Sequence, residues 1–531
     1  MDTTSPFSKH LKDSIEQRVH YAYLLETGDD ALLARIFLIR NARVSIDIQT
    51  FIWSEDECGS FIFHELFLAA SRGVTVRLLF DDLTLRSKPD YVAYLATLHP
   101  NLLLKQYNPL SKNLRTSMIE LIAGLGFNFR QSNQRMHNKI IVVDGQFGIT
   151  GGRNCGNDYF DRDSERTFKD RDVLILGPAV SDMQRSFESY WDFELTFPSK
   201  EMHDLQHSIR ANNYPRLDLE DGYVIPSMFK DLTRLTQDHD AFRSRIVDYG
   251  FRLDQVQFVA DQPGKVASLE DSANTTRVLT DLIRSANESI VIQSPYLVLS
   301  KEGQRLFKDV GEKKPTLITM ISTNSLAAAD HYYAYAFSYK NKKAYVKKLS
   351  WQIFELKPRP TDESTMSEHV KGVQKNDKHH MCIHSKTFMF DKKKTFIGSF
   401  NLDPRSVMLN TEAGLLISDE KFSSHVHGLI MKDIAPQNSW TIGVRQKQPV
   451  LKYFNELFEN LFAQIPFANI WPFTYTTSYQ LKPGGIKLAF NHPDFQQHYD
   501  SVGMFPEQGV SLKTLKTRLV KAFFGPIEPM I

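Results

Sequence analysis

Cysteine is scarce in this sequence, and its few copies form no recognisable pattern. Among 531 residues only Cys58, Cys155 and Cys382 occur, with no CxxC pair. A disulfide framework or a zinc ribbon needs more cysteines at closer spacing, so both are excluded. The scarcity fits a reducing compartment, and a chain of this length can bury a large core without disulfides.

Long hydrophobic runs are missing as well. No window approaches the roughly 18 to 20 apolar residues that span a bilayer, and the stretch from Met1 to Pro6 does not lead from basic into apolar residues. We therefore expect a cytoplasmic protein whose association with the inner face of the cell membrane is peripheral.

An excess of charge of one sign is also absent. The chain has 64 Lys and Arg against 62 Asp and Glu, a net charge of +2. Bulk charge therefore does not indicate a polyanionic partner, and local charge has to decide. Because no long basic groove is evident, we do not expect nucleic acid as a ligand. The basic run from Lys340 to Lys348 is more typical of a solvated helix face than of a binding patch.

What the sequence does contain is an internal duplication. The strand-like window 41–49 resembles the window 285–293. In the first copy a helical stretch at 62–71 ends near Gly73 and is followed by a strand at 74–80. Strand, helix and strand in succession predict a βαβ unit with a parallel sheet.

The duplication divides the chain into four parts. We place a first repeat at 20–198, a polar connecting region at 199–264, a second repeat at 265–438 and an aromatic C-terminal tail at 439–531. The connecting region shows no motif, and the tail has no counterpart in the first half.

Each repeat carries the pattern His-x-Lys-x4-Asp. The residues are His137, Lys139 and Asp144 in the first repeat, and His384, Lys386 and Asp391 in the second. A Gly and an Asn follow at matched distances, ending at Asn154 and Asn401. One such pattern is weak evidence, but two in register are not accidental.

The spacing has a chemical meaning. On a strand, residues two apart project from the same face, so each His and its Lys would point into one cleft. The Asp144-Gly145 pair predicts a hairpin. Two histidines that titrate near neutral pH can serve as nucleophile and acid, while lysines and amides surround phosphoryl oxygens.

These two motifs resemble the signature of the phospholipase D superfamily. The resemblance implies an α/β fold of two repeats, each a mixed, largely parallel β-sheet flanked by helices, packed as a pseudo-two-fold pair with the active site between them. It also implies a covalent phosphohistidine on His137, with His384 as general acid and then base, although the reverse order is open.

The remaining site residues follow from the same motifs. Asn154, Ser399 and Asn401 are expected to bind the substrate phosphate, although Gly152 stands where the second repeat has Ser399. The family motif counts Asp144 and Asp391 among the catalytic residues; support of the loop is the alternative. We expect no cofactor and no metal, because His379, His380 and His384 converge with no further ligand.

Each catalytic histidine needs an acceptor behind it to present the correct nitrogen. Residues 170–175 align with residues 412–417, which makes Asp170 and Glu412 the proposed orienting carboxylates. Asp172 is the rival for the first role.

Further stretches resemble bacterial cardiolipin synthases of the type that lacks transmembrane helices. They are 49–53, 151–154, 323–328, 355–358 and 398–412. The resemblance implies transfer of a phosphatidyl group onto phosphatidylglycerol, with phosphatidylethanolamine as a candidate donor. A phospholipase D that hydrolyses phospholipids to phosphatidic acid is the alternative; a nuclease and a non-catalytic lipid-binding scaffold rank below it.

The tail offers a means of reaching lipid. Its aromatic side chains recur from Phe454 to Tyr475, and residues 511–523 alternate apolar with basic positions. Such patterns favour a membrane interface, and burial in a core is the alternative.

Overall fold

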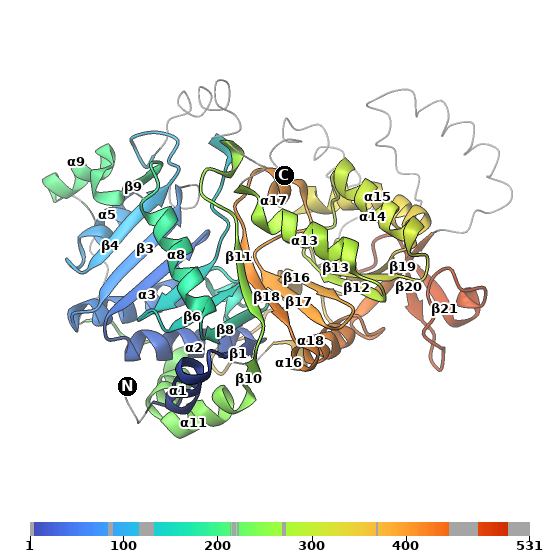
Figure 1. Cartoon of the computed structure of the whole chain (residues 1–531), viewed down its shortest axis with the longest axis horizontal. Coiled ribbons are helices and arrows are strands. Elements are labelled where there is room, and N and C mark those ends of the chain that lie inside the picture. Colours follow the sequence, from blue (N-terminus) through green and yellow to red (C-terminus); the bar gives the residue numbers. More distant parts are fainter. Residues whose placement is uncertain are drawn as a thin grey trace.

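The fold consists of two large β-sheets lying side by side, each with its own helices (Figure 1). The computed structural model describes residues 5–82, 89–115, 132–212, 214, 219, 222–267, 272–367, 370–444 and 476–507. The aromatic residues from Phe454 to Tyr475 and the stretch 511–523, expected to contact a membrane, lie outside these ranges.

The first sheet has the strand order β10-β1-β8-β6-β5-β2-β3-β4-β9. Its strands are β1 His20–Leu25, β2 Ser45–Thr50, β3 Thr75–Asp81, β4 Leu102–Tyr107, β5 Ile140–Val143, β6 Phe147–Gly151, β8 Asp172–Leu176, β9 Thr196–Pro198 and β10 Phe251–Leu253. The second sheet repeats this order as β11-β18-β17-β16-β12-β13-β14-β19, and β20 and β21 extend its edge. Its strands are β11 Val256–Ala260, β12 Ser289–Gln293, β13 Ile318–Asn324, β14 Gln352–Leu356, β16 Thr387–Phe390, β17 Lys394–Gly398, β18 Ala413–Ser418, β19 Ser439–Val444, β20 Thr476–Leu481 and β21 Tyr499–Gly503.

The matching strand orders confirm the duplicated, mixed α/β fold. Within the two large sheets, however, parallel pairing is confined to β2-β3-β4 and to β12-β13-β14, and the other neighbours are antiparallel. A separate parallel pair, β7 Arg166–Lys169 with β15 His380–Ile383, joins the two repeats. The expectation of largely parallel sheets was wrong. Tight turns such as the one at Asp144-Gly145, which joins β5 to β6, can make only antiparallel pairs, whereas parallel pairs need a crossover helix.

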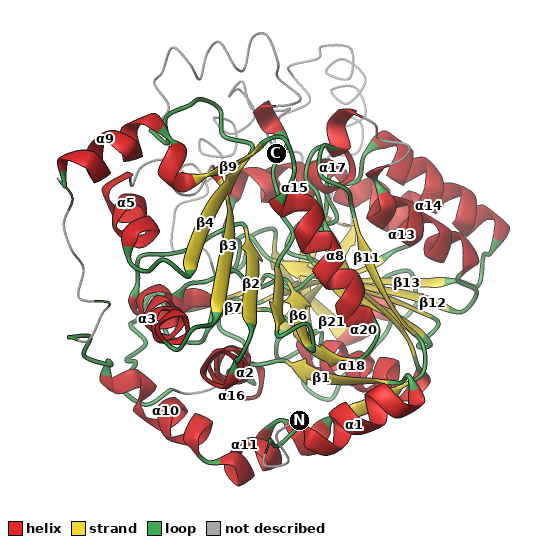
Figure 2. Cartoon of the chain, turned by 60° about the vertical axis from the view of Figure 1, so that its left-hand side comes forward, coloured by secondary structure: helices red, strands yellow, loops and turns green. Residues whose placement is uncertain are grey.

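Helices cover both faces of each sheet. In the first repeat α2 and α3 lie on one face and α8 on the other (Figure 2). The helices up to residue 245 are α1 Ser8–Gln17, α2 Gly28–Asn41, α3 Glu57–Ser71, α5 Pro89–Thr97, α8 Ala179–Trp191, α9 His203–Ala211, α10 Lys230–Gln237 and α11 His239–Arg245. The later ones are α13 Asn274–Ser285, α14 Lys301–Lys313, α15 Tyr332–Lys348, α16 Glu363–Met366, α17 Pro404–Met408, α18 Glu420–Asp433 and α20 Phe495–His498.

A shared core joins the two repeats. Ile140, Val142 and Val173 of the first sheet belong to one buried cluster with Met389 and Leu415 of the second. The same strands point Ile141 and Val143 toward α2 and α3, since alternate residues of a strand face opposite sides. Packing of one sheet against the other therefore fixes the loops at the strand ends relative to each other.

One surface prediction fails within α15. The run from Lys340 to Lys348 was expected to be a solvated face, and Lys340, Lys347 and Lys348 are exposed. Lys342 instead is 1% exposed and forms an ion pair with buried Glu355. The ion pair with Glu355 of β14 decides the position of Lys342, and sequence periodicity does not reveal such a contact.

The connecting region contributes to both sheets. β10 pairs with β1, and β11 pairs with β18 as β1 pairs with β8. By strand equivalence the second repeat thus begins at β11, before residue 265. Likewise β19, in the aromatic tail, takes the place that β9 has in the first repeat.

A fully buried ion pair secures the loop after β11. The Lys265 ammonium lies 2.8 Å from the Asp261 carboxylate, and both side chains are 0% exposed. Lys265 also donates to the carbonyls of Ser406 and Asn410, while Asp261 accepts from the backbone N–H of Glu412. The pair therefore holds the α17 segment against β18.

We expect Lys265→Met to lower the free energy of unfolding by about 3 kcal/mol, because it leaves the Asp261 charge buried without its partner. The double variant Lys265→Met/Asp261→Asn should recover part of this loss, since no unpaired charge remains. Urea unfolding followed by intrinsic fluorescence measures both. Equal destabilisation by the single and double variants would contradict the role given to the charge.

Candidate active site

The two motif histidines lie where the repeats meet. The motif was expected to lie on a strand. His137 and His384 instead directly precede β5 and β16. The His137 N–H donates to the carbonyl of Thr411 at 3.0 Å, and the His384 N–H donates to the carbonyl of Lys169 at 2.8 Å. Each histidine backbone is thus anchored to the opposite repeat.

The orienting carboxylates cross over in the same way. His137 Nδ1 lies 2.9 Å from Glu412 Oε2, and His384 Nδ1 lies 2.6 Å from Asp170 Oδ2. Both carboxylates are 0% exposed. Because each carboxylate accepts from Nδ1–H, the Nε2 atom of each ring is left for substrate.

Asp172, the alternative to Asp170 as an orienting carboxylate, contacts arginines instead of a histidine. It pairs with Arg35 at 2.8 Å and with Arg153 at 3.5 Å, and all three side chains are buried. Its carboxylate therefore neutralises guanidinium groups in the core of the first repeat and does not contact an imidazole.

Ser399 supports a carboxylate rather than the substrate phosphate. Its hydroxyl donates to Glu412 Oε2, and the Ser406 hydroxyl donates to Glu412 Oε1 at 2.7 Å. In the first repeat a Cβ on Gly152 would lie 2.2 Å from Asp170 Oδ1. Gly152 is therefore required by the close approach of Asp170, and Gly151 by that of Asp172, whose Oδ1 would lie 2.1 Å from a Cβ there.

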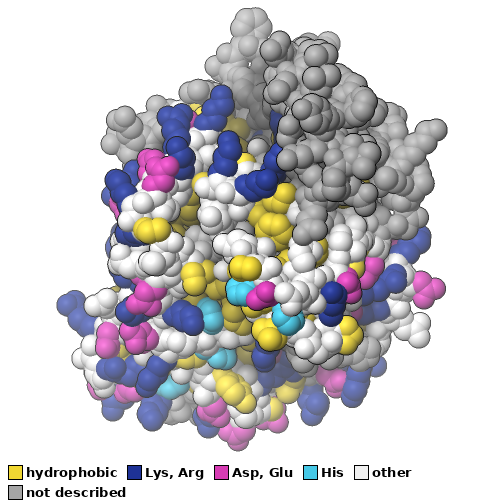
Figure 3. Space-filling model, turned by 90° about the vertical axis from the view of Figure 1, so that its right-hand side faces the viewer, with side chains coloured by type: hydrophobic (Ala, Val, Ile, Leu, Met, Phe, Trp, Pro, Cys, Tyr) yellow, Lys and Arg dark blue, Asp and Glu magenta, His cyan; other side chains and the backbone are white. Residues whose placement is uncertain are grey.

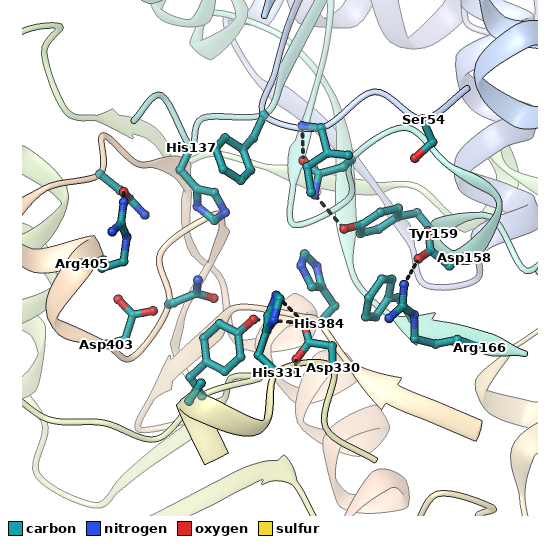
Figure 4. Close-up of a pocket in the computed structure, with 18 residues that line it drawn as sticks. Ser54, His137, Asp158, Tyr159, Arg166, Asp330, His331, His384, Asp403 and Arg405 are labelled. Atoms are coloured by element: carbon teal, nitrogen blue, oxygen red, sulfur yellow. Dashed lines mark hydrogen bonds and ion pairs between the residues drawn. The ribbon is translucent and has the colours of Figure 1, made fainter. Parts of the chain in front are cut away.

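A cavity of about 510 Å³ opens in front of both imidazoles, which point into it (Figure 4). Its lining includes Phe51, Ser54, Asn154, Asp158, Tyr159, Arg166, Phe168, Tyr296, Asp330, His331, Asn401, Asp403, Arg405 and Asn410. Aromatic rings hold the histidines: Phe51 packs edge-on to His137 at 5.2 Å and Tyr159 packs edge-on to His384 at 5.1 Å.

The motif lysines lie beside the histidines. Lys139 Nζ donates to the His137 carbonyl at 2.7 Å, and Lys386 Nζ donates to the His384 carbonyl. Neither lysine is among the residues, all from the described part of the chain, that line the cavity. Lys386 Nζ also lies 2.9 Å from His384 Nδ1. Each lysine is thus held beside its histidine rather than on the cavity wall.

The two asparagines do line the cavity, as the sequence predicted for a phosphate site, but they differ in hydrogen bonding. Asn154 accepts from the Ile52 N–H at 3.2 Å and donates to Tyr159 at 2.9 Å. The Asn401 side-chain oxygen is buried and has no hydrogen-bond partner among the residues that the structure describes. Asn401 therefore has the greater capacity to bond a substrate.

Asp144 and Asp391, counted with the catalytic residues by the motif, are corrected to structural roles. The Asp144 carboxylate accepts from the N–H groups of Arg43, Val44 and Ser45. Asp391 does the same for residues 287–289. Each occupies a left-handed turn position, so its carboxylate ties the hairpin to the start of the neighbouring strand.

Burial sets the protonation of the site. It lowers the pKa of His137, and it lowers the pKa of His384 to about 4 with the Lys386 charge acting in the same direction. Burial also lowers the pKa of Lys139 to about 7. It lowers the pKa of Lys386 as well. Both imidazoles are consequently neutral at pH 7 before an anion binds.

Several cavity residues were missed by motif reasoning. Arg405 enters from α17 near His137, and Asp330 accepts a hydrogen bond from Tyr296 at 3.0 Å near His384. Arg166 faces the same cavity and pairs with Asp158 at 2.6 Å. No short motif contains these residues; only the 398–412 stretch, which holds Arg405, pointed to one of them.

Across the described ranges, no group of three or more His, Cys, Asp or Glu side chains is placed to hold a metal ion. Of the helices that the structure describes, none is both long and apolar enough to span a bilayer.

Known proteins are similar to this chain in sequence. The family described as "Cardiolipin synthase, PLD-like domain" matches residues 36–191 and 279–434. Cardiolipin synthase C of Escherichia coli is 34% identical over 402 residues, covering 75% of this chain and 81% of that protein. An uncharacterized protein of Helicobacter pylori is 33% identical over 450 residues, covering 82% and 83% of the two chains.

A solved structure shares the fold. The phosphatidylserine synthase of Haemophilus influenzae superposes with a TM-score of 0.54 at 16% identity, covering 86% of this chain and 98% of its own. The two family matches, each holding one histidine and one carboxylate of the crossed pairs, establish that the chain belongs to the phospholipase D superfamily and is an enzyme of its cardiolipin synthase type.

Proposed function

We propose that this enzyme transfers a phosphatidyl group onto the headgroup hydroxyl of phosphatidylglycerol, forming cardiolipin through a covalent phosphohistidine. The observation that carries the proposal is the pair of buried imidazoles, each held at Nδ1 by a carboxylate of the other repeat and facing one cavity. The similarity to cardiolipin synthase C supports the choice of lipid substrates.

In the first step His137 Nε2 attacks the phosphorus of the donor lipid. A P–N bond forms, the P–O bond to the headgroup alcohol breaks, and His384 Nε2–H gives its proton to the departing oxygen. The low pKa of His384 is compatible with this role because a bound phosphate anion raises the pKa of an imidazole beside it.

In the second step the hydroxyl of phosphatidylglycerol enters. His384, now neutral, accepts the hydroxyl proton, the oxygen attacks phosphorus, and the P–N bond to His137 breaks. Glu412 would stabilise the positive charge on the phosphorylated imidazole of His137, and the hydroxyls of Ser399 and Ser406 hold that carboxylate in place.

Access to lipid fits one face of the molecule. Figure 3 shows hydrophobic side chains gathered around several histidines, with Lys, Arg, Asp and Glu side chains mixed on the surrounding surface. The apolar centre of such a surface would suit contact with a bilayer, and the Lys and Arg side chains around it would suit anionic headgroups. We propose peripheral binding to the inner face of the cell membrane in this orientation.

The first test is lipid analysis by mass spectrometry after the purified protein is incubated with vesicles of phosphatidylglycerol and phosphatidylethanolamine. Cardiolipin should accumulate, and the released alcohol identifies the donor lipid. His137→Ala and His384→Ala should each abolish the product. Accumulation of phosphatidic acid instead would make the enzyme a hydrolase, and unchanged lipids would overturn the proposal.

The covalent step has its own signature. A quenched digest of the His384→Ala variant should contain a phosphatidylated peptide that includes His137, since loss of the base slows the second step. Modification found on His384 in the His137→Ala variant, and none on His137, would reverse the two roles.

Asp170→Asn should lower kcat by about 10³ or more while the midpoint of thermal unfolding stays within a few degrees, because the amide cannot stabilise an imidazolium. Asp172→Asn is the matched control. It should lower the midpoint more strongly, since Arg35 and Arg153 lose their buried partner, but reduce kcat far less. The prediction fails if the two variants lose kcat equally.

The kcat/KM for lipid should fall as pH rises above about 7. Lys139, whose pKa is about 7, is charged below that pH and neutral above it, so the cation that helps to bind phosphate is lost on the alkaline side. Lys139→Arg keeps its charge and should move the alkaline limb to higher pH. An unchanged limb would exclude Lys139 as its source.

A further inference from the structure

A second cavity lies beside the catalytic one in the second repeat. Its volume is about 200 Å³, and its walls come from α13, α14, β16, the loop before α14 and the segment that leads into α17. The lining is largely apolar and includes Leu279, Leu299, Phe307, Phe388, Phe400 and Leu402. Each of these side chains is otherwise buried in the core of the second repeat.

The corresponding place in the first repeat is filled by charges. Arg35 on α2 and Arg153 after β6 both pair there with Asp172 on β8. Strand pairing makes Gly414 the equivalent of Asp172, because Gly398 pairs with Gly414 as Gly151 pairs with Asp172.

The two arginines are replaced as well. Leu279 precedes the end of α13 by the same number of residues as Arg35 precedes the end of α2, and Phe400 stands just before Asn401 as Arg153 stands just before Asn154. The second repeat has thus exchanged a buried ionic cluster for apolar side chains and a glycine.

The exchange leaves space. In the first repeat the cavity bounded by Arg35, Ile141, Arg153 and Cys155 measures about 10 Å³, too little for more than one water molecule. In the second repeat the cavity bounded by the equivalent Leu279, Phe388, Phe400 and Leu402 measures about 200 Å³. Exposed Arg284 and Glu302 also line this cavity, so it reaches the surface rather than being a closed void, and its apolar walls are suited to an apolar ligand.

The two cavities meet at one residue. Asp403 lines both the catalytic cavity and the apolar one. An alkyl chain that leaves the catalytic cavity past Asp403 would therefore reach the apolar walls of the second cavity.

We propose that the apolar cavity of the second repeat binds the first part of one acyl chain of the phospholipid whose phosphate lies at His137 and His384. This inference rests on the proposed function in so far as the ligand is a phospholipid. An apolar cavity of about 150 Å³ holds benzene, so this one takes an alkyl segment of slightly more than six carbons. The rest of the chain remains in the bilayer.

A variant that fills the cavity tests the proposal. Gly303, in α14, lines the cavity, and a Cβ placed there meets no atom closer than 3.4 Å, so Gly303→Leu should fold and project into the space. Gly311 of the same helix is the matched control, because a Cβ there meets nothing within 4 Å and the residue does not line the cavity.

The substrates separate chain binding from chemistry. With vesicles of dioleoylphosphatidylglycerol, Gly303→Leu should lower kcat/KM at least about tenfold, since burial of the chain contributes about 0.8 kcal/mol per methylene. With bis(4-nitrophenyl) phosphate, which has no acyl chain, its rate should equal that of the wild type. Gly311→Leu should match the wild type on both substrates. Equal loss on both substrates by Gly303→Leu, or no loss on either, overturns the proposal.

Photolabelling supplies a readout that needs no turnover of lipid. Phosphatidylglycerol carrying a diazirine near the start of one acyl chain should label peptides of α13 and α14 in the wild type and not in Gly303→Leu. Labelling confined to other segments overturns the proposal. If the wild type labels these helices and cleaves the small phosphodiester but makes no cardiolipin, the proposed function fails while the acyl site stands.

Discussion

The site depends on one constraint: neither repeat can complete a histidine–carboxylate pair alone. Each imidazole receives its carboxylate from the other repeat, and each histidine N–H bonds to the residue that precedes that carboxylate. Both carboxylates are buried, so an imidazole must lie against each of them to compensate for lost solvation. Sheet packing, hairpin geometry and the Lys265–Asp261 pair all serve to keep these two crossed contacts in place.

The duplication preserves backbone and changes interior chemistry. The strand orders correspond from β1 to β9 and from β11 to β19, and Asp144 and Asp391 secure equivalent turns in the same way. Glu412 nevertheless gains two hydroxyl donors where Asp170 has a glycine opposite it, and the Arg35–Asp172–Arg153 cluster has an apolar counterpart. Two repeats with one fold can therefore differ in function: the first holds a buried cluster of ion pairs, and the second has an apolar cavity in the equivalent place.

Much of this could be predicted from the sequence. The paired motifs identified His137, His384 and both repeats, and the alignment of 170–175 with 412–417 chose Asp170 and Glu412. Such inferences succeed because the two repeats share one fold, so residues at matched spacings occupy equivalent places in both. The sequence by itself determined the candidate residues of the site and the duplicated α/β fold.

Contacts between distant segments were decided only by the tertiary structure. In the tertiary structure Ser399 donates to Glu412 rather than lying ready for the phosphate, and Asp144 and Asp391 bind backbone amides. Lys342 is buried against Glu355. Parallel pairing is limited to three strands of each large sheet. The tertiary structure also crossed the carboxylates between repeats and brought Arg405 and Asp330 to one cavity. Local spacing carries no information on these contacts, because they depend on how the two sheets pack against each other.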